Sequence, residues 1–349
     1  ALKEQYPEAD LHLLVNNECT KITPLMPYID KVYCFERKLI QTACGEYSRP
    51  LLEPIDRVVK LANQLNSESY DLVVNLSHTK LSGLMAGMVE AKEYRGLVIK
   101  DGSKSNLSSP WTAYLDKYAG QRCKSHFHYV DINCYLAKVK ITASPLVLVE
   151  TKQGMAEAEK IMSSEEPFIC IQLFTSDKKK DLSLKKWKSA LGSFQMLNPR
   201  VRILALGAEF ERETLEEAVK ELRQEGIHLE IAICSLEGAF SLLSRCEGLL
   251  SGDTSIKHMG SCLGIPILEV ALGSSDSSRT GVYKTNSYVV ESKEPCFPCG
   301  HRSECHKASH LCSESIDGEA LGLMFSHLIQ KNHNGIRVLA KEYKQWIRV

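Results

Sequence analysis

The chain has 349 residues, of which 44% are hydrophobic and 25% charged, and its 43 lysines and arginines balance 43 acidic residues. This length suits two domains with separate apolar cores, and the neutral balance excludes a global field for binding nucleic acid or an anionic membrane. No run is long enough to span a bilayer and no signal peptide is recognisable, so we expect a cytoplasmic protein in which most of the 13 cysteines are reduced.

The first half of the chain alternates short β-rich runs with helical stretches. The expected strands are residues 11–16, 31–35, 71–77 and 94–100. Residues 52–68 place apolar side chains three and four positions apart, which predicts an amphipathic helix, and residues 128–139 predict another. Residues 101–110 are rich in Ser, Lys and Asn and are expected to form a loop.

The second half repeats this rhythm. The expected strands are residues 168–174, 201–207, 229–234, 247–252, 265–270 and 286–292. Apolar runs that do not alternate with polar residues are typical of strands buried on both faces, and strand–helix spacing indicates parallel sheets. A helix is expected at residues 183–197, and a closing helix at residues 335–349. The prediction is an α/β protein of two Rossmann-like domains, residues 1–150 and 151–349, facing a cleft.

A dense polar cluster, "SGDTSIKHMGS" at residues 251–261, follows the expected strand at 247–252. In open α/β sheets, ligands bind beyond the carboxyl ends of the strands, where helix N-termini present free N–H groups to anions. The N–H groups and hydroxyls of Thr254 and Ser255 could hold a phosphate, and His258 lies one helical turn from Thr254. The alternative is that Asp253 only caps the helix and His258 is a surface residue.

Residues 249–279 resemble the signature of the heptosyltransferases, glycosyltransferase family nine. The family pattern is D-[ST]-G-x-x-H, followed by a small-residue helix, G-x-P, an apolar strand and a G-x-[ST] loop. Asp253, Thr254 and His258 match this pattern, whereas Ser255 stands where the family usually has glycine. The resemblance implies that these four residues bind the nucleotide-sugar donor.

The resemblance extends to the loop after residues 168–174. There the family has a small or hydroxyl-bearing loop, here Thr175 and Ser176, and then a K-x-W element, here Lys185 two places before Trp187. It implies that these residues bind the donor and that Lys185 neutralises charge on the departing diphosphate. The alternative is that the lysines at 178–180 and 185–186 form a solvated face.

Two weaker motifs follow from the same resemblance. In "ILALGAEFERE", Glu211 falls where the family has an acidic residue that meets the nucleotide ribose, with Glu209 as the competitor. Residues 70–99 resemble the family's strand, polar loop and small-residue helix on the acceptor side, which implies acceptor contacts by Ser77, His78 and Ser82.

In the family, a first strand ending in a G-D loop precedes the element that Ala1 begins, and its aspartate is the proposed general base. The resemblance therefore predicts that roughly 20–30 residues, about one strand, a turn and part of a helix, precede Ala1 in the native protein. The general base is then not present in this chain, and none of its residues is assigned that role.

A cysteine-rich loop, residues 295–312, carries Cys296, Cys299, Cys305 and Cys312 in the spacing C-x2-C-x5-C-x6-C. Four thiolates in a loop with proline and glycine suit a tetrahedral metal, so we expect a structural zinc or iron ion. All four positions would be filled by protein, which leaves none open for substrate. The alternative is free thiols or an adventitious disulfide.

Taken together, the resemblance implies a glycosyltransferase of the GT-B architecture. The C-terminal domain would bind ADP-heptose and the N-terminal domain a lipopolysaccharide core or other glycan acceptor, with inversion at the anomeric carbon. Lys185, Asp253 and His258 would be the catalytic residues, with no cofactor for catalysis. A lipid-linked acceptor implies peripheral contact with the inner membrane of a bacterium. The alternatives are a protein-modifying heptosyltransferase and a non-catalytic family member that acts as a binding partner.

Overall fold

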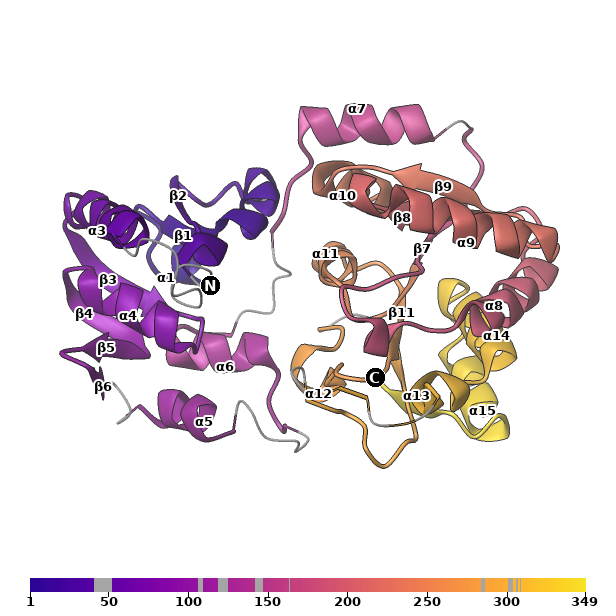
Figure 1. Ribbon diagram of the computed structural model, residues 1–349. Coiled ribbons are helices and arrows are strands. Elements are labelled where there is room, and N and C mark those ends of the chain that lie inside the picture. Colours follow the sequence, from indigo (N-terminus) through magenta and orange to yellow (C-terminus); the bar gives the residue numbers. More distant parts are fainter. Residues whose placement is uncertain are drawn as a thin grey trace. The chain divides into compact units, whose positions relative to one another are not determined.

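The computed structural model describes residues 1–40, 52–105, 109–118, 125–141, 147–162, 164–283, 286–300, 304–305, 307 and 309–349. The chain divides into two compact units. The N-terminal unit comprises Ala1–Cys123 and Tyr129–Ala143, and the C-terminal unit comprises Lys124–His128 and Ser144–Val349 (Figure 1). Among the described residues, no helix combines the length and apolar character needed to cross a bilayer.

The C-terminal unit is built on a single sheet, which has seven strands within the described residues. In spatial order they are β13 (Trp346–Arg348), β12 (Tyr288–Glu291), β11 (Ile267–Ala271), β10 (Leu249–Ser251), β7 (Phe168–Gln172), β8 (Arg202–Gly207) and β9 (Glu230–Ile233). All neighbouring pairs are parallel except β12 and β13. Buried apolar strands therefore form a parallel sheet, as their unbroken apolar runs predict.

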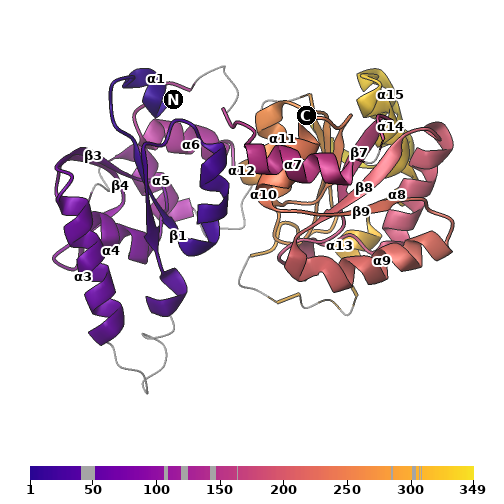
Figure 2. The ribbon, with the colours of Figure 1, turned by 90° about the horizontal axis from the view of Figure 1, so that it is seen from above.

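Helices cover both faces of this sheet. They are α7 (Lys152–Ile161), α8 (Leu184–Leu197), α9 (Arg212–Gln224), α10 (Leu236–Leu243), α11 (Ser255–Leu263), α12 (Ser277–Thr280), α13 (Leu311–Glu314), α14 (Gly318–Ile329) and α15 (His333–Glu342), with one-turn 3-10 helices η2 (Lys178–Lys180) and η3 (Glu209–Glu211). In both views of the ribbon, α10 and α11 lie across the sheet from α8 and α14 (Figures 1 and 2).

The two faces follow from the alternation of side chains along each strand. In β7, Ile169 and Ile171 belong to the main apolar core with α8, α9 and α14, so Cys170 and Gln172 point to the α10 and α11 face. Helices α8 and α14 approach closely because α14 has a glycine at the contact: a Cβ on Gly322 would lie 2.0 Å from the Ala190 carbonyl oxygen.

The expected closing helix at residues 335–349 is wrong in its second half. Helix α15 ends at Glu342, and Trp346–Arg348 form β13, which pairs antiparallel with β12. Lys344 has a φ of 52°, in the left-handed region where a helix cannot continue. The apolar periodicity of residues 335–349 fits a helix. The edge of β12, however, offers backbone hydrogen bonds to Trp346–Arg348, and these hydrogen bonds favour a strand there.

The N-terminal unit contains three two-stranded sheets within the described residues. They pair β1 (His12–Asn16) with β2 (Lys31–Phe35), β3 (Tyr70–Asn75) with β4 (Ala91–Gly96), and β5 (Val98–Lys100) with β6 (Ser103–Ser105). The helices are α1 (Leu2–Gln5), η1 (Asn17–Leu25), α3 (Leu52–Asn66), α4 (Lys80–Met88), α5 (Pro110–Tyr118) and α6 (Tyr129–Leu136).

Two expectations for this unit need correction. The single strand expected at residues 94–100 is divided between β4 and β5, because Gly96 has a φ of 84° that turns the chain between them. The expected loop at residues 101–110 contains β6, which pairs antiparallel with β5.

Candidate functional site

The candidate site lies at the point where the order of the central sheet reverses. After β7 the chain adds β8 and then β9 on one side, and it then returns to place β10 on the other side of β7. The loops that follow β7 and β10 therefore lead to helices on opposite faces of the sheet, and ligands of open α/β sheets bind beside the point where such loops separate. Thr175 follows β7 and Asp253 follows β10. The two loops are in close contact, since a Cβ on Gly252 would lie 3.0 Å from Thr175 Cγ2.

Helix α11 begins at the end of the loop after β10. Thr254 is its N-cap, and the Thr254 hydroxyl accepts a hydrogen bond from the Lys257 N–H at 3.4 Å and lies 3.1 Å from Ser251 Oγ. Ser255, the first residue of the helix, is exposed. The remaining N–H groups of this first turn have no partner within a helix and carry the positive end of its dipole, so the turn suits an anion.

The lysine that contacts this loop is Lys180 rather than Lys185. Lys180 Nζ donates to the Asp253 carbonyl oxygen at 2.9 Å and lies 3.4 Å from Asp253 Oδ2. The loop after β7 is bent back on itself, because the Thr175 N–H donates to Asp181 Oδ1 at 2.8 Å. Asp177 caps the turn η2 by accepting the N–H of Lys179 at 3.1 Å. These bonds turn Lys180 inward before α8 begins.

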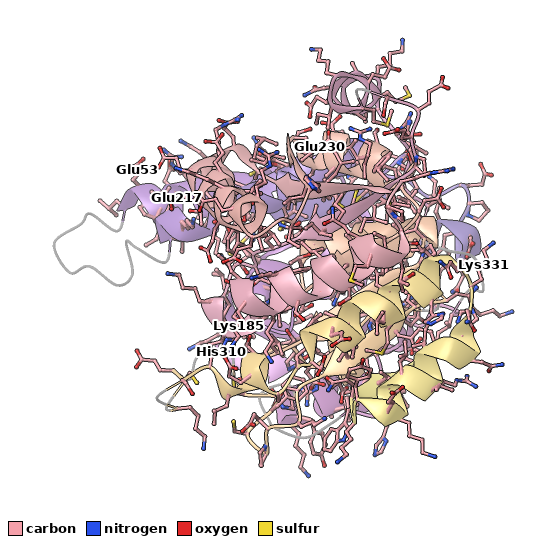
Figure 3. All side chains as sticks on the ribbon, turned by 90° about the vertical axis from the view of Figure 1, so that its right-hand side faces the viewer. Glu53, Lys185, Glu217, Glu230, His310 and Lys331 are labelled. Carbon is pink, nitrogen blue, oxygen red and sulfur yellow. The ribbon has the colours of Figure 1, made fainter. Side chains whose placement is uncertain are left out.

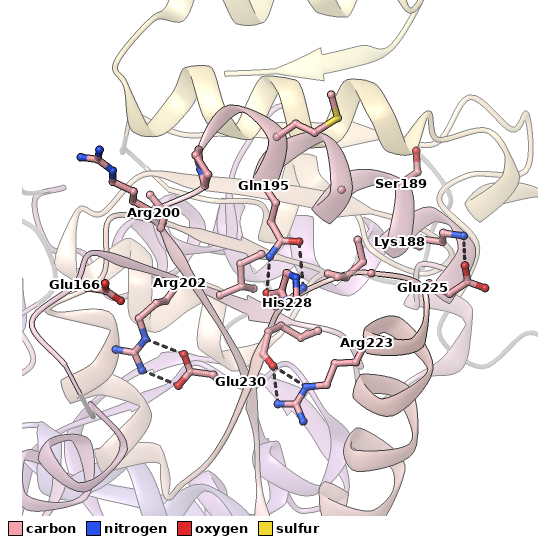
Figure 4. Close-up of a pocket in the computed structure, with 18 of the residues that line it drawn as sticks. Glu166, Lys188, Ser189, Gln195, Arg200, Arg202, Arg223, Glu225, His228 and Glu230 are labelled. Carbon is pink, nitrogen blue, oxygen red and sulfur yellow. Dashed lines mark hydrogen bonds and ion pairs between the residues drawn. The ribbon is translucent and has the colours of Figure 1, made fainter.

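Lys185 lies on the exposed surface of α8 (Figure 3). It lines a groove of about 1460 Å³ between α8 and the segment that leads into β9. Figure 4 shows that charged and polar side chains of this groove are engaged with one another: Arg202 with Glu230 at 2.7 Å, and Lys188 with Glu225. Neither Asp253 nor Thr254 lines the groove, so the expected role of Lys185 at the diphosphate has no support from its position.

A second lysine, Lys257, lies in the first turn of α11. Its side chain is completely buried, and Nζ donates to Asp253 Oδ1 at 2.7 Å, to Glu269 Oε1 at 2.9 Å and to the Thr280 carbonyl oxygen at 2.7 Å. Glu269, also fully buried, accepts the Val282 N–H at 2.9 Å with its other oxygen. This network links α11, the loop after β10, β11 and the loop around α12.

The charges of this network determine the protonation states at the site. Burial raises the pKa of Asp253, but the positive charges of Lys257 and Lys180 outweigh burial and hold that pKa below its usual value. Burial lowers the pKa of Lys257, and the charges of Glu269 and Asp253 reverse this effect, so the pKa is raised and the ammonium stays charged. The site therefore holds an ionised carboxylate between two cations at neutral pH.

His258 points from the same turn of α11, with Nε2 4.0 Å from Asp253 Oδ1. Desolvation and the nearby charge of Lys257 lower the pKa of His258 to about 4, although the imidazole is half exposed. At neutral pH the imidazole is consequently uncharged, and it can donate or accept a hydrogen bond but does not add a third cation.

Of the other expected donor-site residues, Thr175 and Glu211 form hydrogen bonds within their own loops. The Thr175 hydroxyl donates to the Asp177 carbonyl oxygen at 2.8 Å, and Ser176 is exposed beside it. Glu211 Oε2 accepts the Ala208 N–H at 2.9 Å, so this carboxylate caps its own turn. Its competitor Glu209 forms an ion pair with Arg212 at 2.8 Å.

The expected acceptor-side residues lie together in the N-terminal unit, where α4 begins after β3. Ser82 completes a capping box with Thr79, and its hydroxyl accepts from Asn75 Nδ2 at 3.2 Å. Ser77 is exposed. His78 Nε2 lies 3.4 Å from Asp116 Oδ1, and His78 Nδ1 is buried with no hydrogen-bond partner among the described residues. Ser82 therefore has a structural role in the helix start, whereas Ser77 is the exposed residue of the three.

The expected metal site is not assembled in the part of the chain that the structure describes. No group of three or more His, Cys, Asp or Glu side chains there is arranged to hold a metal ion. Cys305 is exposed, whereas Cys312 is buried in α13 among apolar side chains, and Cys296 and Cys299 are partly buried. The Cys299 N–H donates to the Gly273 carbonyl oxygen at 2.8 Å, which ties this cysteine to the loop after β11. The expectation of a structural zinc or iron ion is therefore unsupported.

Three residues of the site were not identified from the sequence: Lys180, Lys257 and Glu269. Two signals could have found them. Glu269 is the single charged residue in the apolar strand β11, and such a residue needs a buried partner. Lys257 follows Asp253 by four residues, the spacing of an ion pair along a helix.

Residues 58–310 match the family model of glycosyltransferase family 9 (heptosyltransferase). The chain belongs to this family. No curated protein sequence matches the chain. The match to the family confirms the resemblance that Asp253, Thr254 and His258 suggest.

Solved structures of the family share the fold over nearly the whole chain. A glycosyltransferase of family 9 from Veillonella parvula is 13% identical, with 98% of this chain and 91% of that chain covered and a TM-score of 0.65. E. coli heptosyltransferase WaaC with ADP is 15% identical, with 95% and 92% covered and a TM-score of 0.63. E. coli ADP-heptose lps heptosyltransferase II is 15% identical, with 98% and 93% covered and a TM-score of 0.61. The α/β fold is thus that of the heptosyltransferases.

Proposed function

We propose that this family 9 protein transfers a heptose or a related sugar from a nucleotide-diphospho-sugar to a glycan acceptor, with inversion at the anomeric carbon. The observation that carries the proposal is the charged opening at the start of α11, where Asp253 lies between Lys180 and Lys257. ADP-heptose is the proposed donor, because structures with the same fold include a heptosyltransferase with ADP and an ADP-heptose lps heptosyltransferase. The proposed acceptor is the lipopolysaccharide core.

The proposed donor contacts follow from charge and position. The free N–H groups of Thr254 and Ser255 bind the diphosphate, and Lys180 supplies its countercharge in the role that the sequence suggested for Lys185. Asp253 accepts hydrogen bonds from sugar hydroxyls, and the uncharged His258 donates one to a phosphate oxygen. Thr175 and Ser176 line the neighbouring loop, and Glu211 is the proposed partner of the ribose.

The proposed reaction is a single displacement. The acceptor oxygen forms a bond to the anomeric carbon from one side while the bond to the diphosphate oxygen breaks on the other side. The electron pair of the broken bond stays on the diphosphate, where Lys180 and the N–H groups of α11 stabilise the growing charge. A general base removes the acceptor proton, and no residue is assigned to this step.

On the acceptor side, we propose contacts by Ser77 and His78. Ser77 supports this proposal, because it is exposed where the chain leaves β3 for α4. Ser82 is a weaker candidate, because its hydroxyl already serves the start of α4. A lipid-linked acceptor would bring the protein to the cytoplasmic surface of the inner membrane.

Calorimetric titration with ADP and with ADP-heptose tests this proposal on matched lysine variants. We expect Lys180→Ala to weaken the binding of both nucleotides by about tenfold or more, since it removes one charge-assisted contact to phosphate. Lys185→Ala should change affinity by less than about twofold, because an exposed lysine away from the phosphate contributes little.

Two outcomes would contradict the proposal. If the wild-type protein binds neither nucleotide, the assignment of the donor fails. If Lys185→Ala weakens binding and Lys180→Ala does not, the site lies at the start of α8 instead. Transfer to the acceptor is then followed by mass spectrometry of the product, where a lipopolysaccharide core or a protein acceptor gains the mass of one heptose.

A further inference from the structure

The two oxygens of the Asp253 carboxylate have different surroundings. Oδ1 is bound by the completely buried ammonium of Lys257 at 2.7 Å. Oδ2 lies 3.4 Å from Lys180, whose side chain retains some exposure to solvent. One oxygen is therefore held by a completely buried cation, and the other lies near a cation whose side chain is slightly exposed.

The Lys257 ammonium has no capacity left for a ligand. An ammonium carries three N–H donors, and all three are used by Asp253, Glu269 and the carbonyl of Thr280. Burying a charge is costly unless it is paired and hydrogen-bonded on every side, and here two carboxylates and a carbonyl fulfil this condition. Lys257 is thus fixed, and it does not itself touch the donor.

The same ammonium determines where two loops lie. Asp253 belongs to the loop after β10, and Thr280 to the loop that contains α12. Glu269, which lies in β11, accepts hydrogen bonds from the Lys257 ammonium and from the Val282 N–H. Strand β11 therefore connects Lys257 to the segment that follows α12. Without the positive charge, Glu269 and Asp253 would repel each other and the Thr280 carbonyl would lose a donor.

We propose that Lys257 is a positioning residue of the donor site: it holds Oδ1 of Asp253 and the Thr280 carbonyl so that Oδ2 is presented to the sugar hydroxyls of the donor. The inference rests on the proposed function and deepens it. When the diphosphate attracts Lys180 away from Asp253, Lys257 remains and keeps the carboxylate ionised. Lys180 thus binds the phosphates, whereas Lys257 positions the Asp253 carboxylate that binds the sugar.

The test compares ADP with ADP-heptose, because only the second ligand carries the sugar. In Lys257→Met, which keeps the length of the side chain and removes the charge, we expect affinity for ADP-heptose to fall by about tenfold, as one charge-assisted hydrogen bond is lost. Affinity for ADP should stay within about threefold of wild type. Lys188→Met, an exposed lysine of α8 away from this network, is the control and should change neither affinity.

A pH profile gives a reading that a purely structural role would not produce. Lys257 is a main cause of the lowered pKa of Asp253, and Lys180 and His258 add smaller contributions. In Lys257→Met the carboxylate should therefore take up a proton at higher pH, so the acid limb of ADP-heptose affinity should move to higher pH. Removing Lys257 also relieves the lowering of the His258 pKa, and this change affects the phosphates that ADP and ADP-heptose share. The ADP profile therefore measures the contribution of His258, and an additional shift seen with ADP-heptose alone reports Asp253.

A double variant keeps the test decisive if the single variant does not fold. Lys257→Met with Glu269→Gln removes the buried ammonium together with its fully buried partner, so Glu269 is not left as an uncompensated carboxylate, and Asp253 keeps Lys180. We expect the same selective loss of ADP-heptose affinity. Equal losses for ADP and ADP-heptose, or no loss for either, would overturn the role of Lys257. Absence of binding of both nucleotides to the wild-type protein would instead overturn the proposed function and this inference with it.

Discussion

At the scale of single residues, the site is organised by charge pairs that the fold brings together from distant positions. Lys180 and Asp253 are 73 positions apart, and Lys257 and Glu269 belong to different elements, yet each pair is within hydrogen-bond distance. The result is one ionised carboxylate between two cations, with an uncharged histidine beside it. Binding of a negatively charged diphosphate should therefore change the pKa values of the titratable groups at the site.

The protonation of His258 is the first observable consequence. We expect its imidazole to titrate near pH 4 in the free protein, because burial and Lys257 disfavour the charged form. Bound ADP brings negative charge and should raise this pKa. Two-dimensional NMR of the histidine ring protons, with His258→Gln to assign the signal, measures both values.

The same shift predicts the direction of a pH effect on stability. The lowered pKa means that the unfolded chain binds more protons than the folded chain between about pH 4 and the ordinary histidine value near 6.5. Stability should therefore fall as the pH decreases through this window, and His258→Gln should flatten the fall. A free-protein midpoint for His258 above pH 6.5 would contradict both expectations.

At the scale of elements, close packing between α8 and α14 holds the core of the C-terminal unit. The position of Gly322 allows α14 to lie against the backbone of α8, since a Cβ there would come 2.0 Å from the Ala190 carbonyl oxygen. Gly192, on α8 itself, has room for a methyl group, whose nearest neighbour would be Ile227 Cδ1 at 3.6 Å. The close approach of the two helices thus requires a glycine at position 322 but not at position 192.

Alanine substitution distinguishes these two positions. Gly322→Ala should lower the free energy of unfolding by about 1–3 kcal/mol or more, the usual cost of overpacking against rigid backbone. Gly192→Ala should leave stability unchanged or raise it by up to about 1 kcal/mol, because alanine is the better helix former. Urea denaturation followed by circular dichroism measures both. Equal effects at the two positions would show that α8 and α14 are not in close contact.

At the scale of the whole molecule, the family fold is maintained at 13% identity to one solved relative and 15% to another. In this chain the parallel sheet reverses its order between β7 and β10, and α11 begins after β10.

Ligand-dependent stability tests this arrangement in the intact protein. At about 100 times its dissociation constant, ADP should stabilise the fold by about 2.7 kcal/mol. For a domain of this size, each kcal/mol raises the midpoint of thermal unfolding by about 2–4 °C. NAD, whose diphosphate carries a second nucleoside where the sugar of the donor would lie, should raise it less. A larger effect of NAD in differential scanning fluorimetry would favour a different ligand class.

The sequence allowed the α/β class, most strands and the start of α11 to be predicted, because these depend on local signals: apolar runs, helical periodicity and the hydroxyl of Thr254. It also pointed to Asp253 and His258, because the motif is contiguous. The choice of Lys180 over Lys185 could not be read locally. That choice depends on the turn made by Asp177 and Asp181, which bends the loop after β7 toward Asp253.

The sequence by itself therefore determined the family, most of the elements and the motif at the start of α11. Only the tertiary structure decided which cations meet that motif, that Trp346–Arg348 form an edge strand, and that the four cysteines do not assemble a metal site within the described residues. The physical reason is that helices, strands and caps arise from neighbours along the chain, whereas charge pairs and metal ligands require contacts between segments that only the folded chain brings together.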